Sequence, residues 1–130
     1  MASPDAIANR LRDLEDALDA GTEAMKTAVK ELERLGREAS AAEMAAEVAY
    51  ARVFLATEGT ENTRKQTAIA QTAQLRHAAR IAAHLVVTQK EAMWALREAQ
   101  KSTHAKIDVA RTISADTRAV LEIDKVNWRP

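Results

Sequence analysis

The spacing of apolar residues in the first 58 positions constrains the fold of this chain more than any other feature. One row of a heptad repeat contains Ile7, Leu14, Gly21, Ala28, Leu35, Ala42 and Ala49, and the second contains Leu11, Leu18, Met25, Leu32, Ala39, Ala46 and Val53. The alternating steps of four and three place both rows on one side of an α-helix, as in a coiled-coil seam. Ser3-Pro4-Asp5 is a favourable helix start. We therefore predict one long helix over about residues 4–58.

The sequence Glu58-Gly59-Thr60-Glu61 marks a corner at the end of this helix. Glycine readily ends a helix, and threonine is a favoured N-cap for the next one. The 69 residues after Glu61 contain no glycine, and no proline before Pro130. We predict a second helix over about residues 60–124, with its hinge at Gly59 and Thr60. The expected fold is an all-α, long antiparallel helical hairpin that forms a single domain over residues 1–130.

The second helix has a seam that polar residues interrupt. One row contains Thr72, Ala79, Val86, Met93, Gln100, Ile107, Ser114 and Leu121, and the other contains Leu75, Ala82, Gln89, Leu96, Thr103, Ala110 and Thr117. Lys101-Ser102-Thr103-His104 is its weakest stretch, where we expect a kink or a new helix start. An alternative fold is a three- or four-helix bundle, in which Gly21-Thr22 ends one helix and caps another. The heptad phase does not shift across Gly21, which favours the hairpin.

Composition supports closely packed helices and gives little evidence of a thick core. The chain has 29 alanines and only four aromatic residues, and alanine favours helices but fills a core poorly. There is no cysteine, which excludes disulfides and thiolate chemistry. The longest uncharged apolar stretches, such as residues 81–89, are too short to span a bilayer, and the first residues lack a signal-peptide pattern. We expect no membrane association.

Opposite charges fit the antiparallel arrangement. Residues 1–58 carry 7 Lys and Arg against 12 Asp and Glu, whereas residues 59–130 carry 12 against 7. If the chain reverses at Gly59, facing residues have numbers that sum to about 119. The pairs with opposite charge are Glu43 with Arg76, Glu38 with Arg80, Glu31 with Lys90, Lys30 with Glu91, Glu23 with Arg97, Asp13 with Lys106 and Arg12 with Asp108. Such pairs set helix partner and register more than stability.

The same register leaves residues 116–130 without a facing helix, because the first helix starts near Pro4. This overhang carries Val120, Leu121, Ile123 and Trp128. Exposed apolar residues in a group are typical of an interaction surface. We predict that these four residues bind a partner, which is a second copy of the chain or another protein.

Residues 62–90 contain no acidic residue and several basic ones. Their cations are Arg64, Lys65, Arg76, Arg80 and Lys90. Lysine and arginine without nearby carboxylates are typical of surfaces that bind phosphates, so nucleic-acid binding is an alternative function. The other interpretation is that these cations pair with the acidic first helix. No aromatic residue is interleaved with them to stack on bases.

The motifs of catalysis and metal binding do not occur in the sequence. His77, His84 and His104 lack the spacing of three or four that places metal ligands on one helix face. There is no glycine-rich phosphate loop and no nucleophile elbow, and a helical hairpin offers no enclosed pocket to shift carboxylate pKa values. We therefore expect a non-enzymatic protein with no catalytic residue, metal, cofactor or small-molecule substrate.

Two stretches carry a resemblance to known proteins. Residues 51–60 (ARVFLATEGT), followed by Arg64, and residues 107–112 (IDVART), leading to Arg118, resemble small helical proteins encoded by phages and prophages of Gram-positive, especially actinobacterial, hosts. The resemblance implies a phage-encoded accessory protein. We expect the protein in the cytoplasm of the bacterial host. We expect a self-associating coiled-coil interaction protein. The alternatives are a nucleic-acid-binding accessory to phage recombination or replication, and a virion structural or assembly protein.

Overall fold

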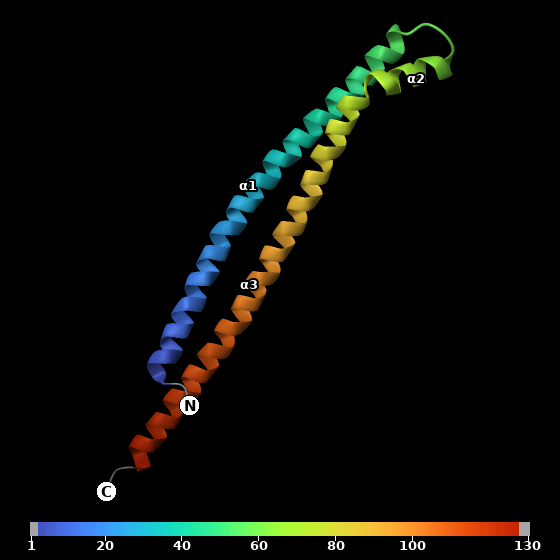
Figure 1. Cartoon of the computed structure of the whole chain (residues 1–130). Coiled ribbons are helices and arrows are strands. Elements are labelled where there is room, and N and C mark those ends of the chain that lie inside the picture. Colours follow the sequence, from blue (N-terminus) through green and yellow to red (C-terminus); the bar gives the residue numbers. More distant parts are fainter. Residues whose placement is uncertain (1–2, 128–130) are drawn as a thin grey trace. The chain divides into compact units, whose positions relative to one another are not determined.

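The protein is built from long α-helices. The computed structural model describes residues 3–127, with side chains for residues 3–124. These residues form α1 (Pro4–Ala56), α2 (Glu61–Gln71) and α3 (Ala73–Asn127), with no strand among them (Figure 1). The prediction of an all-α fold with long helices in a hairpin-like arrangement is confirmed.

The chain divides into two compact units, and both α1 and α3 contribute to each. The terminal unit contains Met1–Lys26 and Trp94–Pro130, and the turn unit contains Thr27–Met93. Within each unit the segments of α1 and α3 lie side by side and run antiparallel (Figure 1). The turn unit also holds α2 and the corner where the chain reverses.

The corner has the geometry that its residues favour. Gly59 has a φ of +119°, a conformation that residues with a side chain rarely adopt. Thr60 then caps α2, since its Oγ1 accepts a hydrogen bond from the N–H of Thr63 at 3.2 Å. The prediction of a hairpin corner at Gly59-Thr60 is therefore confirmed.

Thr72 divides the predicted second helix into α2 and α3. Its φ of −103° and ψ of 9° depart from helical values. The N–H and the hydroxyl of Thr72 both donate to the carbonyl oxygen of Ala68, at 3.1 Å and 2.6 Å. Hydroxyl bonds to the preceding turn tend to bend helices, and Thr72 is only 1% exposed, so packing holds it there. The structure thus corrects the single helix predicted over residues 60–124.

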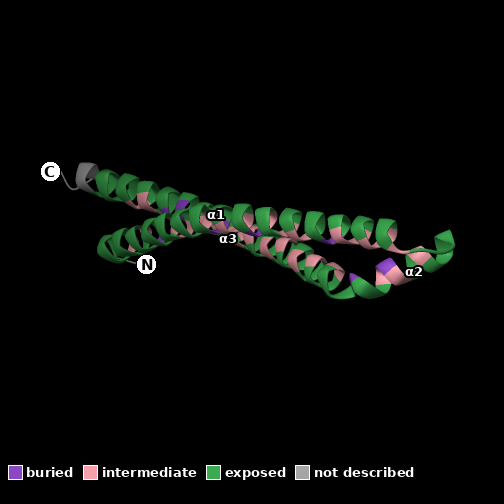
Figure 2. Cartoon of the chain, turned by 90° about the horizontal axis from the view of Figure 1, so that it is seen from above, coloured by how far each residue is buried: buried purple, intermediate pink, exposed green. Residues whose placement is uncertain are grey.

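The predicted seam is the least exposed part of both long helices. Every position in the two predicted rows of α1 is buried or half-buried (Figure 2). In the terminal unit Leu14 packs with Ile107 and Ala110. On α3 the seam positions behave likewise except for Leu75, which follows the break at Thr72, and Leu121, which lies beyond the start of α1.

Neither of the other predicted interruptions is a helix end. Gly21 lies inside α1, and the hydroxyl of Thr22 donates back to the carbonyl oxygen of Leu18 at 3.0 Å, so it caps no new helix. The alternative with a loop at Gly21-Thr22 is wrong. Helix α3 also continues through residues 101–104, where the hydroxyl of Thr103 donates to the carbonyl oxygen of Ala99 at 3.0 Å. The hydroxyl is satisfied within the helix without ending it.

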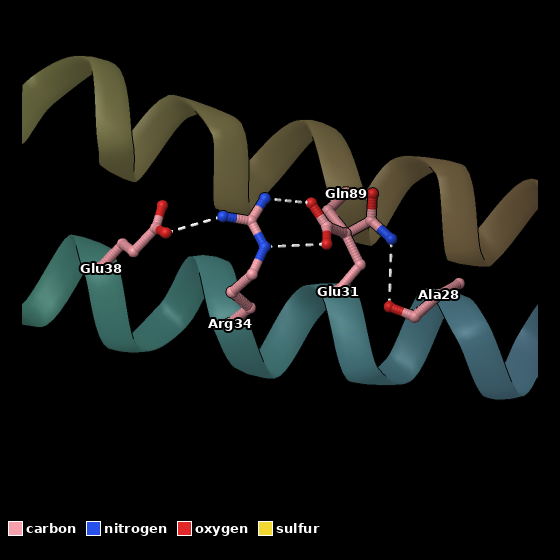
Figure 3. A network of polar contacts seen from close by, with 5 residues as sticks. All are labelled: Ala28, Glu31, Arg34, Glu38 and Gln89. Atoms are coloured by element: carbon pink, nitrogen blue, oxygen red, sulfur yellow. Dashed lines mark hydrogen bonds and ion pairs between the residues drawn. The ribbon is translucent and has the colours of Figure 1, made fainter.

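Polar contacts in the turn unit differ from the predicted charge pairs. Arg34 donates from Nε to Glu31 at 3.0 Å and from Nη1 to Glu38 at 2.6 Å, all within α1 (Figure 3). These glutamates were expected to face Lys90 and Arg80, but an arginine one turn away on the same helix holds them. The hydrogen bond from Arg34, together with its positive charge, lowers the pKa of Glu31, although partial desolvation opposes the shift.

Direct polar contacts between α1 and α3 occur in both units. In the turn unit, Nε2 of Gln89 donates across the seam to the carbonyl oxygen of Ala28 at 3.0 Å (Figure 3). In the terminal unit, Arg111 lies 3.4 Å from Glu15, an ion pair that the sequence register did not predict. Both side chains are more than 45% exposed, so the ion pair contributes little to stability.

Candidate functional site

Three exposed apolar side chains lie near the carboxyl end of α3 in the terminal unit. Val120, Leu121 and Ile123 are 49%, 47% and 59% exposed, and we call them the overhang surface. Helix α3 continues past the start of α1 here (Figure 1). Trp128, the fourth predicted partner-binding residue, lies outside the described residues.

A groove at the overhang surface is formed by α3 alone. Its lining consists of Ile113, Asp116, Thr117, Val120, Leu121 and Asp124. No residue of α1 within the described part of the chain lines this groove, because α1 begins at Pro4. The groove therefore contains apolar side chains, whose removal from water is favourable in free energy, beside two carboxylates that stay hydrated.

A neighbouring groove in the same unit lies between α1 and α3. It is lined by Arg10, Leu14, Ser102, Ala105, Lys106, Val109, Ala110 and Ile113. Val109 and Ile113 are 59% and 48% exposed, and the sequence analysis did not select them. Val109 and Ile113 belong to a second series of residues on α3, spaced at alternating steps of four and three, and this spacing could have identified them from the sequence.

The turn unit also exposes apolar residues, two of which (Met44 and Val48) were not predicted and one of which (Leu75) was expected in the seam. Met44, Val48 and Leu75 line a shallow groove between α1 and α3, together with the alanines at 41, 45 and 49 and with Arg52. Met44 is 67% exposed. The alanines contribute little apolar area, so most of the apolar surface of this groove comes from Met44, Val48 and Leu75.

Arg64, the first cation of the basic stretch, stabilises the corner by contacts with Phe54 at the end of α1. Its Nε donates to the carbonyl oxygen of Phe54 at 3.0 Å, and its guanidinium lies 4.6 Å from the centre of the Phe54 ring. Carbonyls in the last turn of a helix lack partners within the helix, and a cation there also suits the helix dipole. Arg64 therefore caps the end of α1 from the first turn of α2.

The next three cations share a groove with acidic residues. Lys65, Arg76 and Arg80 line this groove of the turn unit together with Glu43 and Glu47. Its other lining residues are Ala46, Tyr50, Ile69 and Ala79. The carboxylates reduce the positive potential that a phosphate would meet. Lys90, the fifth cation, is exposed elsewhere on α3.

The histidines are not gathered into a site. His77, His84 and His104 are all exposed on α3. Among the residues that the structure describes, no group of three or more histidine, aspartate or glutamate side chains is placed to hold a metal ion. The helices described also include none with the length and apolar character to cross a membrane.

Comparison with known proteins adds no relative to these observations. No protein-family model, no curated protein and no solved structure matches the chain.

Proposed function

We propose that the chain is a non-enzymatic coiled-coil interaction protein that associates with a second copy of itself through the carboxyl-terminal part of α3. The observation that carries the proposal is the groove lined by α3 alone, with the exposed side chains of Val120 and Leu121 in its lining. The resemblance of residues 51–60 and 107–112 to phage and prophage proteins supports a role as an accessory factor in a phage-like genome.

The energy available from the overhang surface can be compared with the cost of association. Fully burying a valine, leucine or isoleucine contributes roughly 1.5–3 kcal/mol, so burying the exposed half of each contributes about 1 kcal/mol. Three residues from each of two copies then contribute about 6 kcal/mol before any cost. Association costs at least about 4 kcal/mol, so a stable dimer needs more of α3 than these three residues.

Deleting residues 116–130 tests the proposal directly. We expect light scattering to give the mass of a dimer for the full chain and a clear shift toward monomer for the shortened chain. Val120→Ser with Ile123→Ser should act in the same direction without removing backbone. Leu55→Ser is the matched control, since Leu55 is 74% exposed but lies in the turn unit, and it should leave the mass unchanged. A mass that the deletion does not alter would refute the proposal.

The second candidate function is nucleic-acid binding in phage recombination or replication. The convergence of Lys65, Arg76 and Arg80 on one groove supports it. It predicts binding to DNA at low salt that weakens steeply as salt rises and is lost in the double variant Arg76→Glu with Arg80→Glu. Neutralising Glu43 and Glu47 should strengthen such binding. Absence of binding at low salt would remove this candidate.

A role in virion structure or assembly is the third candidate. It shares the self-association of the first proposal and differs in where the protein is found. It predicts that purified particles contain the chain in stoichiometric amount, which mass spectrometry of the particles tests.

A further inference from the structure

Helix α3 carries two heptad series in the terminal unit, and only one of them is covered by α1. The inner series, Gln100, Thr103, Ile107, Ala110, Ser114 and Thr117, is buried or half-buried throughout. The other series, which we call the outer stripe, contains Ala99, Ser102, Lys106, Val109, Ile113, Asp116, Val120 and Ile123, and all eight are exposed. A helix with two seams is typical of bundles in which it packs against more than one neighbour.

The outer stripe passes two grooves of opposite charge. The groove beside Val109 contains Arg10 and Lys106, and the groove beside Val120 contains Asp116 and Asp124. Within the described residues none of these four charged side chains makes an ion pair. One end of the stripe is therefore cationic and the other end anionic.

We propose that the outer stripe packs against the outer stripe of a second copy, antiparallel, about a two-fold axis close to Arg111. This inference rests on the self-association proposed above and adds its surface, direction and register. Residues 99–123 span about 36 Å of helix at 1.5 Å per residue, which is the length of a substantial coiled-coil contact.

The positions of the charged residues select this register. Lys106 and Asp116 are the only charged residues of the outer stripe, and they stand at equal distances on either side of position 111. Antiparallel pairing about that position places Lys106 of each copy opposite Asp116 of the other. Parallel pairing in register would place each charge against its own kind, which destabilises the contact.

The apolar residues fit the same axis. Val109 and Ile113 are also equidistant from position 111, so that each valine meets the isoleucine of the other copy at the centre. Further out, Ala99 faces Ile123, a small residue against a large one, as close helix packing requires. The two-fold arrangement brings the cationic groove of each copy onto the anionic groove of the other.

A second copy is the occupant that this symmetry specifies. In a two-fold contact the same surface must complement itself, with residue i facing j and j facing i. The outer stripe meets that condition in charge and in side-chain size. An unrelated partner would not require both ends of the stripe to match each other.

Charge reversals test the register without removing apolar surface. Lys106→Asp alone and Asp116→Lys alone should each raise the dimer dissociation constant about tenfold or more, because each creates two like-charge contacts across the axis. Mixing equal amounts of the two variants should restore dimers to near wild-type affinity, since both contacts are then opposite in charge. Asp108→Lys is the matched control, an exposed change of charge on the same helix outside the stripe.

Analytical ultracentrifugation measures these constants, and circular dichroism checks that each variant keeps its helix content. Weakened single variants together with a restored mixture support the register. If the deletion of residues 116–130 weakens the wild-type dimer but neither charge reversal does, the register is overturned and the proposed function still stands. The same holds if the single variants are weakened but mixing them fails to restore the dimer. A monomeric wild-type chain would overturn both.

Discussion

Two glycines inside α1 offer a matched test of the packing. Gly36 has open space around it, since a Cβ built there meets no heavy atom within 4 Å apart from its chain neighbours and the adjacent backbone of its own helix. Alanine is more favourable than glycine in a helix interior by about 0.8–1.0 kcal/mol. We therefore expect Gly36→Ala to raise the free energy of unfolding by about 1 kcal/mol.

Gly21 should respond differently because α3 lies close to it. A Cβ at this position would lie 3.3 Å from Cγ of Gln100, closer than ordinary van der Waals contact. Gln100 also donates from Nε2 to the hydroxyl of Thr22 at 3.2 Å, so moving it endangers a hydrogen bond worth about 1 kcal/mol. The gain in helix propensity should therefore be offset, and Gly21→Ala should leave stability unchanged or slightly reduced.

Urea unfolding followed by circular dichroism, at one fixed protein concentration, measures both effects. The two substitutions should differ by about 1 kcal/mol in unfolding free energy. In a Gln100→Ala background the contact is gone, so Gly21→Ala should then stabilise about as much as Gly36→Ala does. Equal stabilisation by both substitutions in the wild-type background would refute the close approach of α3 to Gly21.

Three further predictions concern polar contacts of the turn unit. Arg64→Met should lower the unfolding free energy by about 1–2 kcal/mol, because the last turn of α1 loses a donor and the Phe54 ring loses a cation, and urea unfolding checks this. Gln89→Ala should cost about 1 kcal/mol in the same assay through the lost hydrogen bond and packing, whereas Gln89→Leu should be nearly neutral because an apolar side chain of similar size fills the same space. Arg34→Gln should raise the pKa of Glu31 toward its ordinary value, measured by NMR titration. Because that pKa is lowered in the folded chain, the contribution of Glu31 to stability is present above its ordinary pKa and lost as the pH falls through the lowered one.

The parts of the fold that could be predicted are those set by local chemistry and an unbroken period. The rows of α1 keep their phase across Gly21, and the structure leaves every one of those positions buried or half-buried. The corner was predictable because Gly59 supplies a positive φ and Thr60 a capping oxygen. Both the heptad period and the corner can be recognised from residues close in the sequence.

The break at Thr72 could not be predicted in this way. Threonine hydroxyls donate to the carbonyl four residues earlier at several other places in the chain, Thr103, Thr112 and Thr117 among them, and α3 continues through all three. Thr72 differs in being buried, which depends on what packs around it. Tertiary packing therefore decides which of several similar threonines interrupts a helix.

The choice between the two seams of α3 is a tertiary effect of the same kind. In the terminal unit the inner series is largely polar, whereas the outer stripe holds Val109, Ile113, Val120 and Ile123. If apolar content alone decided which series packs against α1, the outer stripe would face α1. The inner series can face α1 because the hydroxyls of Thr103 and Thr117 bond within their own helix, at 3.0 Å and 2.9 Å, and add no unsatisfied polar group to the seam. Because the largely polar inner series packs against α1, the more apolar outer stripe stays exposed to water. The hydrophobic effect therefore favours the packing of a second helix against the outer stripe.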